Sequence, residues 1–160
     1  MALDRQLLDQ VRQIFATLKH NYIIRISCDT SSAAGKEMIE FFTEFAGASE
    51  KIGIEIEGIN SDRAVATLVR DGVPTGISFR CIPGGHEFTS LLLAVMNADG
   101  QGRTLPDEAV QSRIARLKGD ISLTTYVSLE CTNCPDVVQA LNQMALFNDR
   151  VTSETVDGNM

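Results

Sequence analysis

The sequence predicts an α/β protein in which one complete fold is followed by the first half of a second, related fold. Strand-like and helix-like segments alternate along the chain, which is typical of this class. Two stretches about 100 positions apart are similar in pattern, which indicates an internal repeat. The second of them carries Cys131-Thr132-Asn133-Cys134 where a strand passes into a helix.

The first four elements predict a βαβ unit behind an amphipathic helix. Leu3, Leu7, Val11, Ile14 and Leu18 recur at helical spacing over residues 3–18. A strand is expected over residues 22–27, a helix over 36–48, and a half-buried strand where isoleucines alternate at 52, 54 and 56. Two strands joined by a helix should be parallel.

A hairpin and a second βαβ unit follow. Residues 64–70 and 76–81 flank a turn-rich segment, 71–75, and a helix is expected over 86–97. A connecting helix over 106–118 should end at Gly119. The remaining elements are a strand at 121–129, a helix at 132–147 and a strand at 151–156. The inner side of that last helix is predicted to carry Val137, Val138, Leu141, Met144 and Ala145.

The internal repeat has a consequence for the first copy. Ile23–Cys28 can be laid over Tyr126–Cys131 at a separation of 103 positions (131 − 28), and the following strands near 100 (158 − 58). In this alignment Ser31 stands opposite Cys134. The element order βαβ–ββα, connector, βαβ resembles tandem thioredoxin-like folds, the first complete but without a CxxC and the second present only as its first βαβ half.

Four segments follow from this interpretation. Residues 1–20 form the N-terminal helix of the first fold, and 21–103 form that fold, which is redox-inactive. Residues 104–119 form the connecting helix. Residues 120–160 form the N-terminal βαβ half of the second fold, with its CxxC.

Composition and charge exclude several function classes. The chain has 160 residues, 44% of them hydrophobic and 22% charged, as in a globular protein. A net charge of −7 argues against nucleic acid as a partner. No apolar run is long enough to span a bilayer, and no signal-peptide core precedes the first helix, so a cytoplasmic location is expected.

The pair Cys131 and Cys134 predicts thiol–disulfide exchange. Free N–H groups and the positive end of a helix dipole stabilise a thiolate at the helix start. Thiols in such motifs have pKa values of about 3.5–7.5 rather than about 8.5. Cys131 is then the attacking cysteine, and Cys134, one turn on, resolves the mixed disulfide. Pro135 is tolerated in the first turn because its missing N–H has no partner there.

Structural zinc is the alternative for the same motif. A closed zinc site needs two further ligands, and only Cys28, Cys81, His20 and His86 are available, with no second close pair among them. No metal site and no cofactor site are therefore predicted. Val73-Pro74-Thr75 is similar to the cis-proline loop that faces the dithiol in thioredoxins, but it lies in the inactive copy and is interpreted as an ordinary turn.

Two stretches carry a more specific resemblance. Gly85-His86-Glu87-Phe88-Thr89-Ser90-Leu91 and the segment from Tyr126 to Asn142 around the CxxC closely resemble the N-terminal domain of the alkyl hydroperoxide reductase F subunit. That bacterial flavoprotein is similar to thioredoxin reductase with two fused thioredoxin folds in front. The first of these has no working dithiol.

The resemblance implies a place in an electron pathway. Electrons pass from NADH through FAD to a flavin-domain dithiol, then to Cys131 and Cys134, and from there to the disulfide of a peroxiredoxin, the C subunit. The partners are therefore a peroxiredoxin and a flavoprotein dithiol domain, with no nucleic acid and no membrane. FAD and NADH would be held by C-terminal domains of the family, so no NADH oxidation is expected from this chain alone.

The resemblance also gives Glu87 a role in tuning the reactive cysteine. A carboxylate alone would raise the pKa of a thiol, so Glu87 is interpreted as a proton relay or an orienting group. The alternative is an acid in the first turn of a helix that complements the dipole.

Part of the family pattern is missing beyond Gly158, so the chain is expected to be a fragment or a short form. The open edge of its second fold is expected to permit self-association, such as a homodimer. Three hypotheses remain: a dithiol relay that feeds a peroxiredoxin, a stand-alone protein disulfide oxidoreductase or glutaredoxin-like protein, and a non-catalytic interaction module with zinc at the CxxC.

Overall fold

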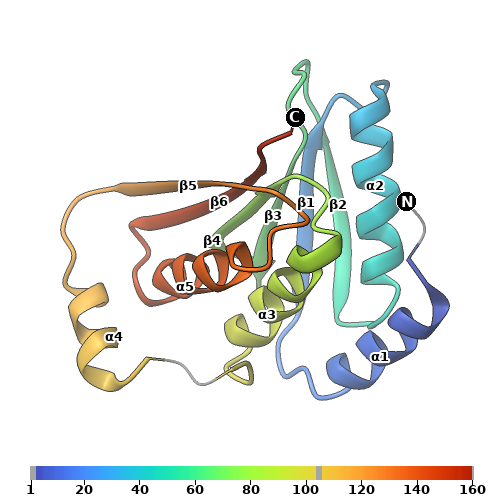
Figure 1. Cartoon of the computed structure of the whole chain (residues 1–160). Helices are drawn as coiled ribbons and strands as arrows, with labels where there is room; N and C mark the ends of the chain where they lie inside the picture. Colours follow the sequence, from blue (N-terminus) through green and yellow to red (C-terminus); the bar gives the residue numbers. More distant parts are fainter. Residues whose placement is uncertain (1–2, 104–105, 160) are drawn as a thin grey trace.

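One six-stranded mixed sheet runs through the whole molecule, and helices α2, α3 and α5 pack against one of its faces (Figure 1). The computed structural model describes residues 3–103 and 106–159. The strand order is β2-β1-β3-β4-β6-β5. The elements are α1 (Arg5–Phe15), β1 (Tyr22–Cys28), α2 (Ala33–Ala46), β2 (Ile52–Gly58), β3 (Val65–Arg70), β4 (Val73–Arg80), a 3₁₀ helix η1 (Gly85–Glu87), α3 (Phe88–Ala98), α4 (Glu108–Ala115), β5 (Ile121–Val127), α5 (Cys134–Phe147) and β6 (Val151–Asp157).

The predicted α/β class and both parallel strand pairs are confirmed. β1 lies parallel to β2, and β5 lies parallel to β6. The two βαβ units join because β4 pairs in parallel with β6, from Ile77 opposite Ser153 to Arg80 opposite Val156. The strand β6 is therefore paired on both sides, and within the described residues the unpaired edges of the sheet belong to β2 and β5. The division of the chain into four segments stays a prediction, and residues 104 and 105 at one boundary lie outside the described ranges.

The hairpin differs from the prediction because its turn is tighter. The turn consists of Asp71 and Gly72, both with positive φ (47° and 81°), as the two-residue hairpin turn requires. The segment 73–75, interpreted above as part of the turn, begins β4 instead, and Pro74 lies opposite Val69. The Asp-Gly pair was the sequence signal for this short turn.

Two predicted inward positions are wrong. Val137 is 51% exposed and Ile56 is 48% exposed. Val138 and Ala145 are buried as predicted, and Gln139 and Asn142 are buried beside them, so two polar residues take part in the helix–sheet interface. The helix boundaries also differ: α2 begins three residues before the predicted start, and α4 is shorter than residues 106–118 at both ends.

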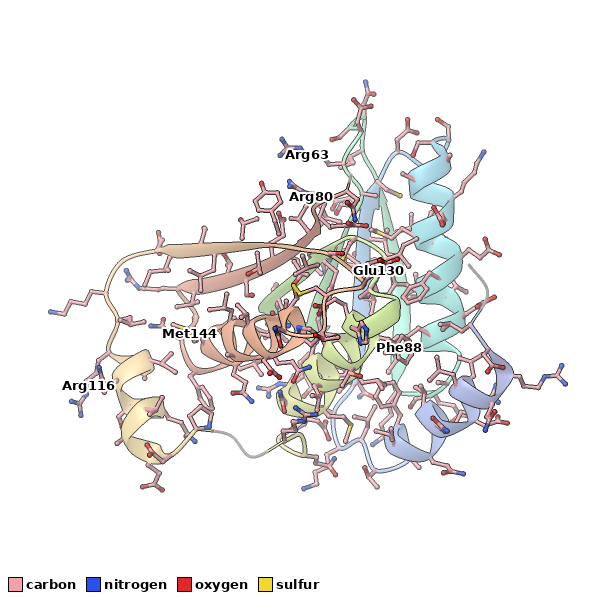
Figure 2. The ribbon with its side chains drawn as sticks, in the orientation of Figure 1. Arg63, Arg80, Phe88, Arg116, Glu130 and Met144 are labelled. Carbon is pink, nitrogen blue, oxygen red and sulfur yellow. A yellow bond between two sulfur atoms is a disulfide. The ribbon has the colours of Figure 1, made fainter. Side chains whose placement is uncertain are left out.

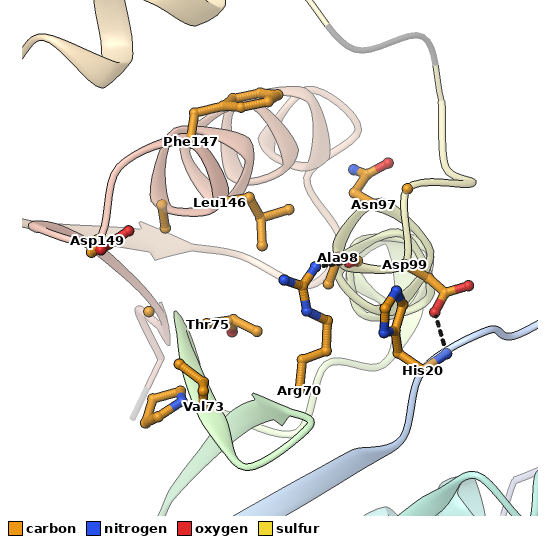
Figure 3. A pocket seen from close by; sticks show the side chains of 14 residues that line it. His20, Arg70, Val73, Thr75, Asn97, Ala98, Asp99, Leu146, Phe147 and Asp149 are labelled. Atoms are coloured by element: carbon orange, nitrogen blue, oxygen red, sulfur yellow. Dashed lines mark hydrogen bonds between the residues drawn. The ribbon is translucent and has the colours of Figure 1, made fainter.

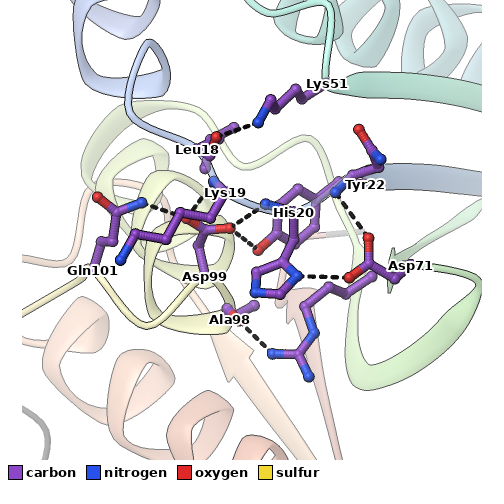
Figure 4. A network of polar contacts seen from close by, with 11 residues as sticks. Leu18, Lys19, His20, Tyr22, Lys51, Asp71, Ala98, Asp99 and Gln101 are labelled. Atoms are coloured by element: carbon purple, nitrogen blue, oxygen red, sulfur yellow. Dashed lines mark hydrogen bonds and ion pairs between the residues drawn. The ribbon is translucent and has the colours of Figure 1, made fainter.

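A buried carboxylate fastens the end of α3 to the segment before β1 (Figure 4). Asp99 accepts hydrogen bonds from the backbone N–H groups of Lys19 (2.9 Å) and His20 (3.0 Å), from the hydroxyl of Tyr22 (2.8 Å), and from the amide of Gln101. Burial raises the pKa of Asp99, but these four donors together outweigh it and leave the pKa below its ordinary value.

Asp99→Asn is expected to lower the free energy of unfolding by about 1–3 kcal/mol near neutral pH, because an amide cannot accept from all four donors. The lowered pKa means that the wild-type contribution is complete above the unfolded pKa of about 3.9 and is lost as the pH falls through the folded value. Urea denaturation of the wild type and of Asp99→Asn, from neutral pH down to strong acid, measures the difference in their free energies of unfolding. A gap between the two proteins that stays constant into strong acid would contradict this account.

Candidate redox site

Cys131 lies in the loop between β5 and α5, Cys134 is the first residue of α5, and the two form a disulfide with their Cα atoms 5.5 Å apart. The yellow sulfur–sulfur bond is visible among the side chains in Figure 2. The loop turns where the N–H of Cys131 donates to the carbonyl of Ser128 (2.9 Å). Helix α5 begins at Cys134, and both cysteines are half-buried.

The start of α5 directs a donor at the first sulfur. The backbone N–H of Cys134 donates to Sγ of Cys131 at 3.2 Å. Asn133, the N-cap residue, makes no side-chain capping bond, and Pro135 follows in the first turn. An N–H aimed at Cys131 and the positive end of the helix dipole both favour a thiolate at this sulfur. Asp136 in the same turn opposes them with its negative charge.

The segment Gly85–Phe88 packs against the loop that carries the cysteines. The N–H of His86 donates to the carbonyl of Leu129 at 3.1 Å. Gly85 has φ +55°, and a Cβ atom there would lie 2.7 Å from the same carbonyl oxygen. Glycine is therefore required for this approach. The structure thus brings together the two stretches on which the family resemblance rests, although about 40 positions separate them in the sequence.

Glu87 is buried, with 0% of its surface exposed. It ends η1 and directly precedes α3, and neither carboxyl oxygen has a hydrogen-bond partner among the described residues. Burial raises the pKa of Glu87, while the Ser90 hydroxyl and the charge of His86 act in the opposite direction. The alternative interpretation, an acid that only complements a helix dipole, does not account for a fully buried side chain. Its part in chemistry stays a prediction.

The other cysteines are buried and are not joined to a second sulfur. Cys28 ends β1, and burial raises the pKa of its thiol. Cys81 follows β4, and burial, Asp157 and Glu87 raise the pKa of its thiol to about 12. Both thiols are therefore protonated and poorly nucleophilic at neutral pH.

The predicted separation of 103 positions between the first strands of the two copies is wrong by four residues, whereas the separation near 100 for the following strands is within one residue of the observed 99. β1 and β5 begin at Tyr22 and Ile121, and β2 and β6 begin at Ile52 and Val151, so equivalent strand positions lie 99 apart (121 − 22 and 151 − 52). Cys28 corresponds to Val127, not to Cys131. The helices α2 and α5 lie 101 apart (134 − 33), so Ser31 does not stand opposite Cys134. An even shift of four preserves the alternation of inward and outward side chains, so strand pattern alone could not exclude it.

A cavity of about 560 Å³ lies at the opposite end of the sheet from the disulfide (Figure 3). Its walls come from the start of β4 and the ends of α3 and α5, with Arg70, Leu146 and Phe147 among them. Closer to the redox loop, Met38, Cys81, Gly85 and Leu129 line a smaller cavity of about 330 Å³. No sequence pattern predicted either cavity.

The described ranges hold neither a membrane-spanning helix nor a metal cluster. Residues 3–103 and 106–159 contain no helix with the length and apolar character needed to cross a bilayer. The same ranges contain no group of three or more His, Cys, Asp or Glu side chains placed to hold a metal ion.

Comparisons with known proteins agree with this geometry. The chain is 34% identical to an NADH dehydrogenase of Bacillus subtilis, over 99% of the chain and 30% of that protein. It is 33% identical to the alkyl hydroperoxide reductase F subunit of Pseudomonas aeruginosa, over 98% of the chain and 30% of that protein. The chain therefore spans about 30% of the length of these curated relatives. No family model matches the sequence.

Solved structures cover the chain more completely. The NTD_N/C domain of the alkyl hydroperoxide reductase F subunit from Enterococcus faecalis superimposes with a TM-score of 0.85 at 30% identity, over 98% of this chain and 80% of that one. A protein disulfide oxidoreductase from Aeropyrum pernix, 18% identical over 99% of this chain and 76% of that one, shares the fold with a TM-score of 0.80. The chain belongs to the family formed by the N-terminal domains of the alkyl hydroperoxide reductase F subunits.

Proposed function

We propose that this chain relays electrons by thiol–disulfide exchange from a flavoprotein dithiol to the disulfide of a peroxiredoxin. The observation that carries the proposal is the Cys131–Cys134 disulfide at the start of α5, with the N–H of Cys134 on Sγ of Cys131. A thiolate formed at this sulfur is stabilised by the helix and half-exposed, as an attacking group must be. The activity is proposed for the cytoplasm.

The exchange proceeds in two balanced steps. The Cys131 thiolate attacks one sulfur of the partner disulfide, forms a mixed disulfide and releases the other partner sulfur as a thiolate. Cys134, after losing its proton, attacks Sγ of Cys131, which re-forms the Cys131–Cys134 disulfide and releases the second partner thiol. Two electrons have then passed to the partner. A flavoprotein dithiol returns them to Cys131 and Cys134 by the same two steps in reverse.

Flavin and nicotinamide belong to a separate module in this proposal. Relatives three times as long carry the names NADH dehydrogenase and alkyl hydroperoxide reductase, and we assign the redox cofactors to the part of such proteins that this chain does not span. The chain alone, once reduced, is expected to give up two electrons and stop.

The proposal is tested by giving the reduced chain two alternative substrates. One is the disulfide form of a bacterial two-cysteine peroxiredoxin, and the other is insulin. Peroxiredoxin thiols appearing much faster than insulin thiols support the relay. Equal or faster reduction of insulin favours a stand-alone disulfide oxidoreductase. Reduced protein that retains zinc through gel filtration and reduces neither substrate would show that the CxxC is structural.

Glu87 is proposed as the group that accepts and returns the proton of the dithiol. Burial raises the pKa of Glu87, and a carboxyl group in such a site is a candidate for proton transfer. Its segment packs on the redox loop through the bond from His86 to Leu129.

Glu87→Gln is expected to slow peroxiredoxin reduction at neutral pH by about 10²-fold, since the amide cannot carry a proton. It should also lower the pH at which Cys131 becomes alkylated, because a nearby negative charge is removed. Stopped-flow reduction and pH-dependent alkylation measure the two effects. Glu40→Gln on the exposed face of α2 is the control and should change neither. An unchanged rate in Glu87→Gln would remove Glu87 from the mechanism.

A further inference from the structure

A chain of polar side chains crosses the interface between α3 and α5, where apolar contacts would be expected. Ser90 on α3 is 0% exposed and Gln139 on α5 is 9% exposed. The amide Nε2 of Gln139 donates to Oγ of Ser90 at 3.4 Å. Nη1 of Arg103 donates to the amide oxygen of the same glutamine at 3.4 Å.

The direction of these bonds decides what Ser90 can do. Gln139 occupies a lone pair of the serine oxygen as a donor, so the proton of Ser90 remains free to be donated elsewhere. Glu87 lies three positions earlier, as the N-cap residue of the same helix, and its backbone is already in the helical region, so the two side chains are neighbours. Its carboxyl oxygens are buried and have no partner among the described residues. The hydroxyl of Ser90 is the polar group whose influence most lowers the pKa of Glu87.

We propose that Ser90 and Gln139 are positioning residues that set how readily Glu87 loses its proton: Gln139 orients the Ser90 hydroxyl so that it can donate to the carboxylate when Glu87 ionises. A hydrogen bond to the charged form offsets the desolvation that favours the neutral acid. The pair thereby opposes the rise in the pKa of Glu87 that burial causes. The inference rests on the function proposed above for Glu87.

Other charged and titratable groups surround this site, and none of them takes part in the chain. His86 precedes Glu87 and is exposed, and its charge lowers the pKa of Glu87. Cys81, which follows β4, has a buried thiol whose pKa is raised by the charges of Asp157, at the end of β6, and of Glu87. From α5, Asp136 is exposed in the first turn. Replacing Ser90 or Gln139 leaves all four groups in place, so a resulting change in Glu87 reports the hydrogen bonds.

The test measures the titration of Glu87 directly, by carboxyl carbon NMR on the full chain in its disulfide form, where Cys131 and Cys134 do not titrate. Ser90→Ala and Gln139→Leu are each expected to raise the titration midpoint of Glu87 by about one pH unit. Asn142→Leu is the matched control. Asn142 is a buried amide one turn further along α5, it bonds Ser153 rather than Ser90, and its loss should leave the midpoint unchanged.

A second measurement distinguishes an effect on the protonation of Glu87 from a general loss of packing between α3 and α5. In the reduced chain, Ser90→Ala and Gln139→Leu should shift the pH profile of Cys131 alkylation, and the same substitutions added to Glu87→Gln should have no further effect. Gln139→Glu should not restore the wild-type midpoint, because a carboxylate cannot donate to Ser90.

Two results would overturn the inference. One is a Glu87 midpoint that does not move in Ser90→Ala and Gln139→Leu. The other is a shift of equal size in Asn142→Leu. If Glu87→Gln leaves the alkylation profile of Cys131 unchanged while the NMR midpoint still responds to Ser90 and Gln139, the positioning pair stands and the role of Glu87 in exchange fails.

Discussion

Cys131→Ser is expected to abolish disulfide exchange, leaving a rate indistinguishable from that of buffer. The serine hydroxyl does not ionise near neutral pH, and no other thiol can take over the attack. Cys134 is the resolving cysteine in the next turn, and Cys28 and Cys81 are buried with raised pKa values. Reduction of a peroxiredoxin disulfide by the pre-reduced variant, followed by thiol release, measures the loss.

Cys134→Ser should behave differently, and the contrast identifies the attacking sulfur. This variant retains the nucleophile and loses the group that resolves the mixed disulfide, so it should accumulate a covalent one-to-one complex with its partner. Non-reducing electrophoresis and intact mass measure that complex. The double variant Cys28→Ala, Cys81→Ala serves as control and should exchange at the wild-type rate. Trapping by Cys131→Ser instead of Cys134→Ser would reverse the assignment of the two cysteines.

Phe45→Ala is expected to lower the free energy of unfolding by about 3–5 kcal/mol, the largest effect on stability that we predict. Phe45 is 0% exposed and makes edge-to-face contacts with Phe15 (5.5 Å between ring centroids) and Phe88 (6.1 Å). One ring therefore joins α1, α2 and the start of α3. Removing it leaves a cavity that three packed helices cannot close without moving.

Urea denaturation followed by circular dichroism measures this loss. Phe147→Ala is the matched control, because Phe147 is only half-buried and lies at the end of α5. Its replacement should cost clearly less. Since Phe88 directly follows Glu87, Phe45→Ala should also alter the pH profile of Cys131. Equal losses for the two phenylalanines would show that the three-helix contact is not a centre of the core.

The predictable part of this fold came from residues whose pattern is local. The β-branched and aromatic residues of β1, the period-2 isoleucines of β2 and the turn-forming residues between segments placed the strands within a few positions of where they lie. The CxxC could be predicted as a redox site from the spacing of its two cysteines and from the predicted helix that follows it. The glutamate of Gly85–Phe88 needed the family resemblance, because nothing local distinguishes a buried acid from a surface acid at the start of a helix.

Contacts between segments far apart in the chain could not be predicted from the sequence. The pairing of β4 with β6 joins the two halves of the sheet. It is made by backbone N–H and C=O groups, which are the same in every strand, so the sequence does not reveal which strands pair. The bond from His86 to Leu129 links two loops, and Gly85 could be interpreted only as a glycine before a helix. Gln139 and Asn142 interrupt an apolar helix face, which is a visible signal of a polar interface, but apolar periodicity alone does not detect it.

The spacing of the two βαβ units suggests how a redox loop can be gained or lost in a duplicated domain. In both units the second strand begins 30 positions after the first (52 − 22 and 151 − 121). The helices are equally long, but α5 sits two positions later within its unit than α2 does. The loop after α5 is two residues shorter than the loop after α2, and the loop before α5, which carries Cys131, is two residues longer than the loop before α2. Sliding a helix along a fixed crossover changes the chemistry of the loop while every strand keeps its register. A designer could exploit this by replacing residues 29–33 with residues 128–134, which include both cysteines, and shortening the loop behind α2 by two.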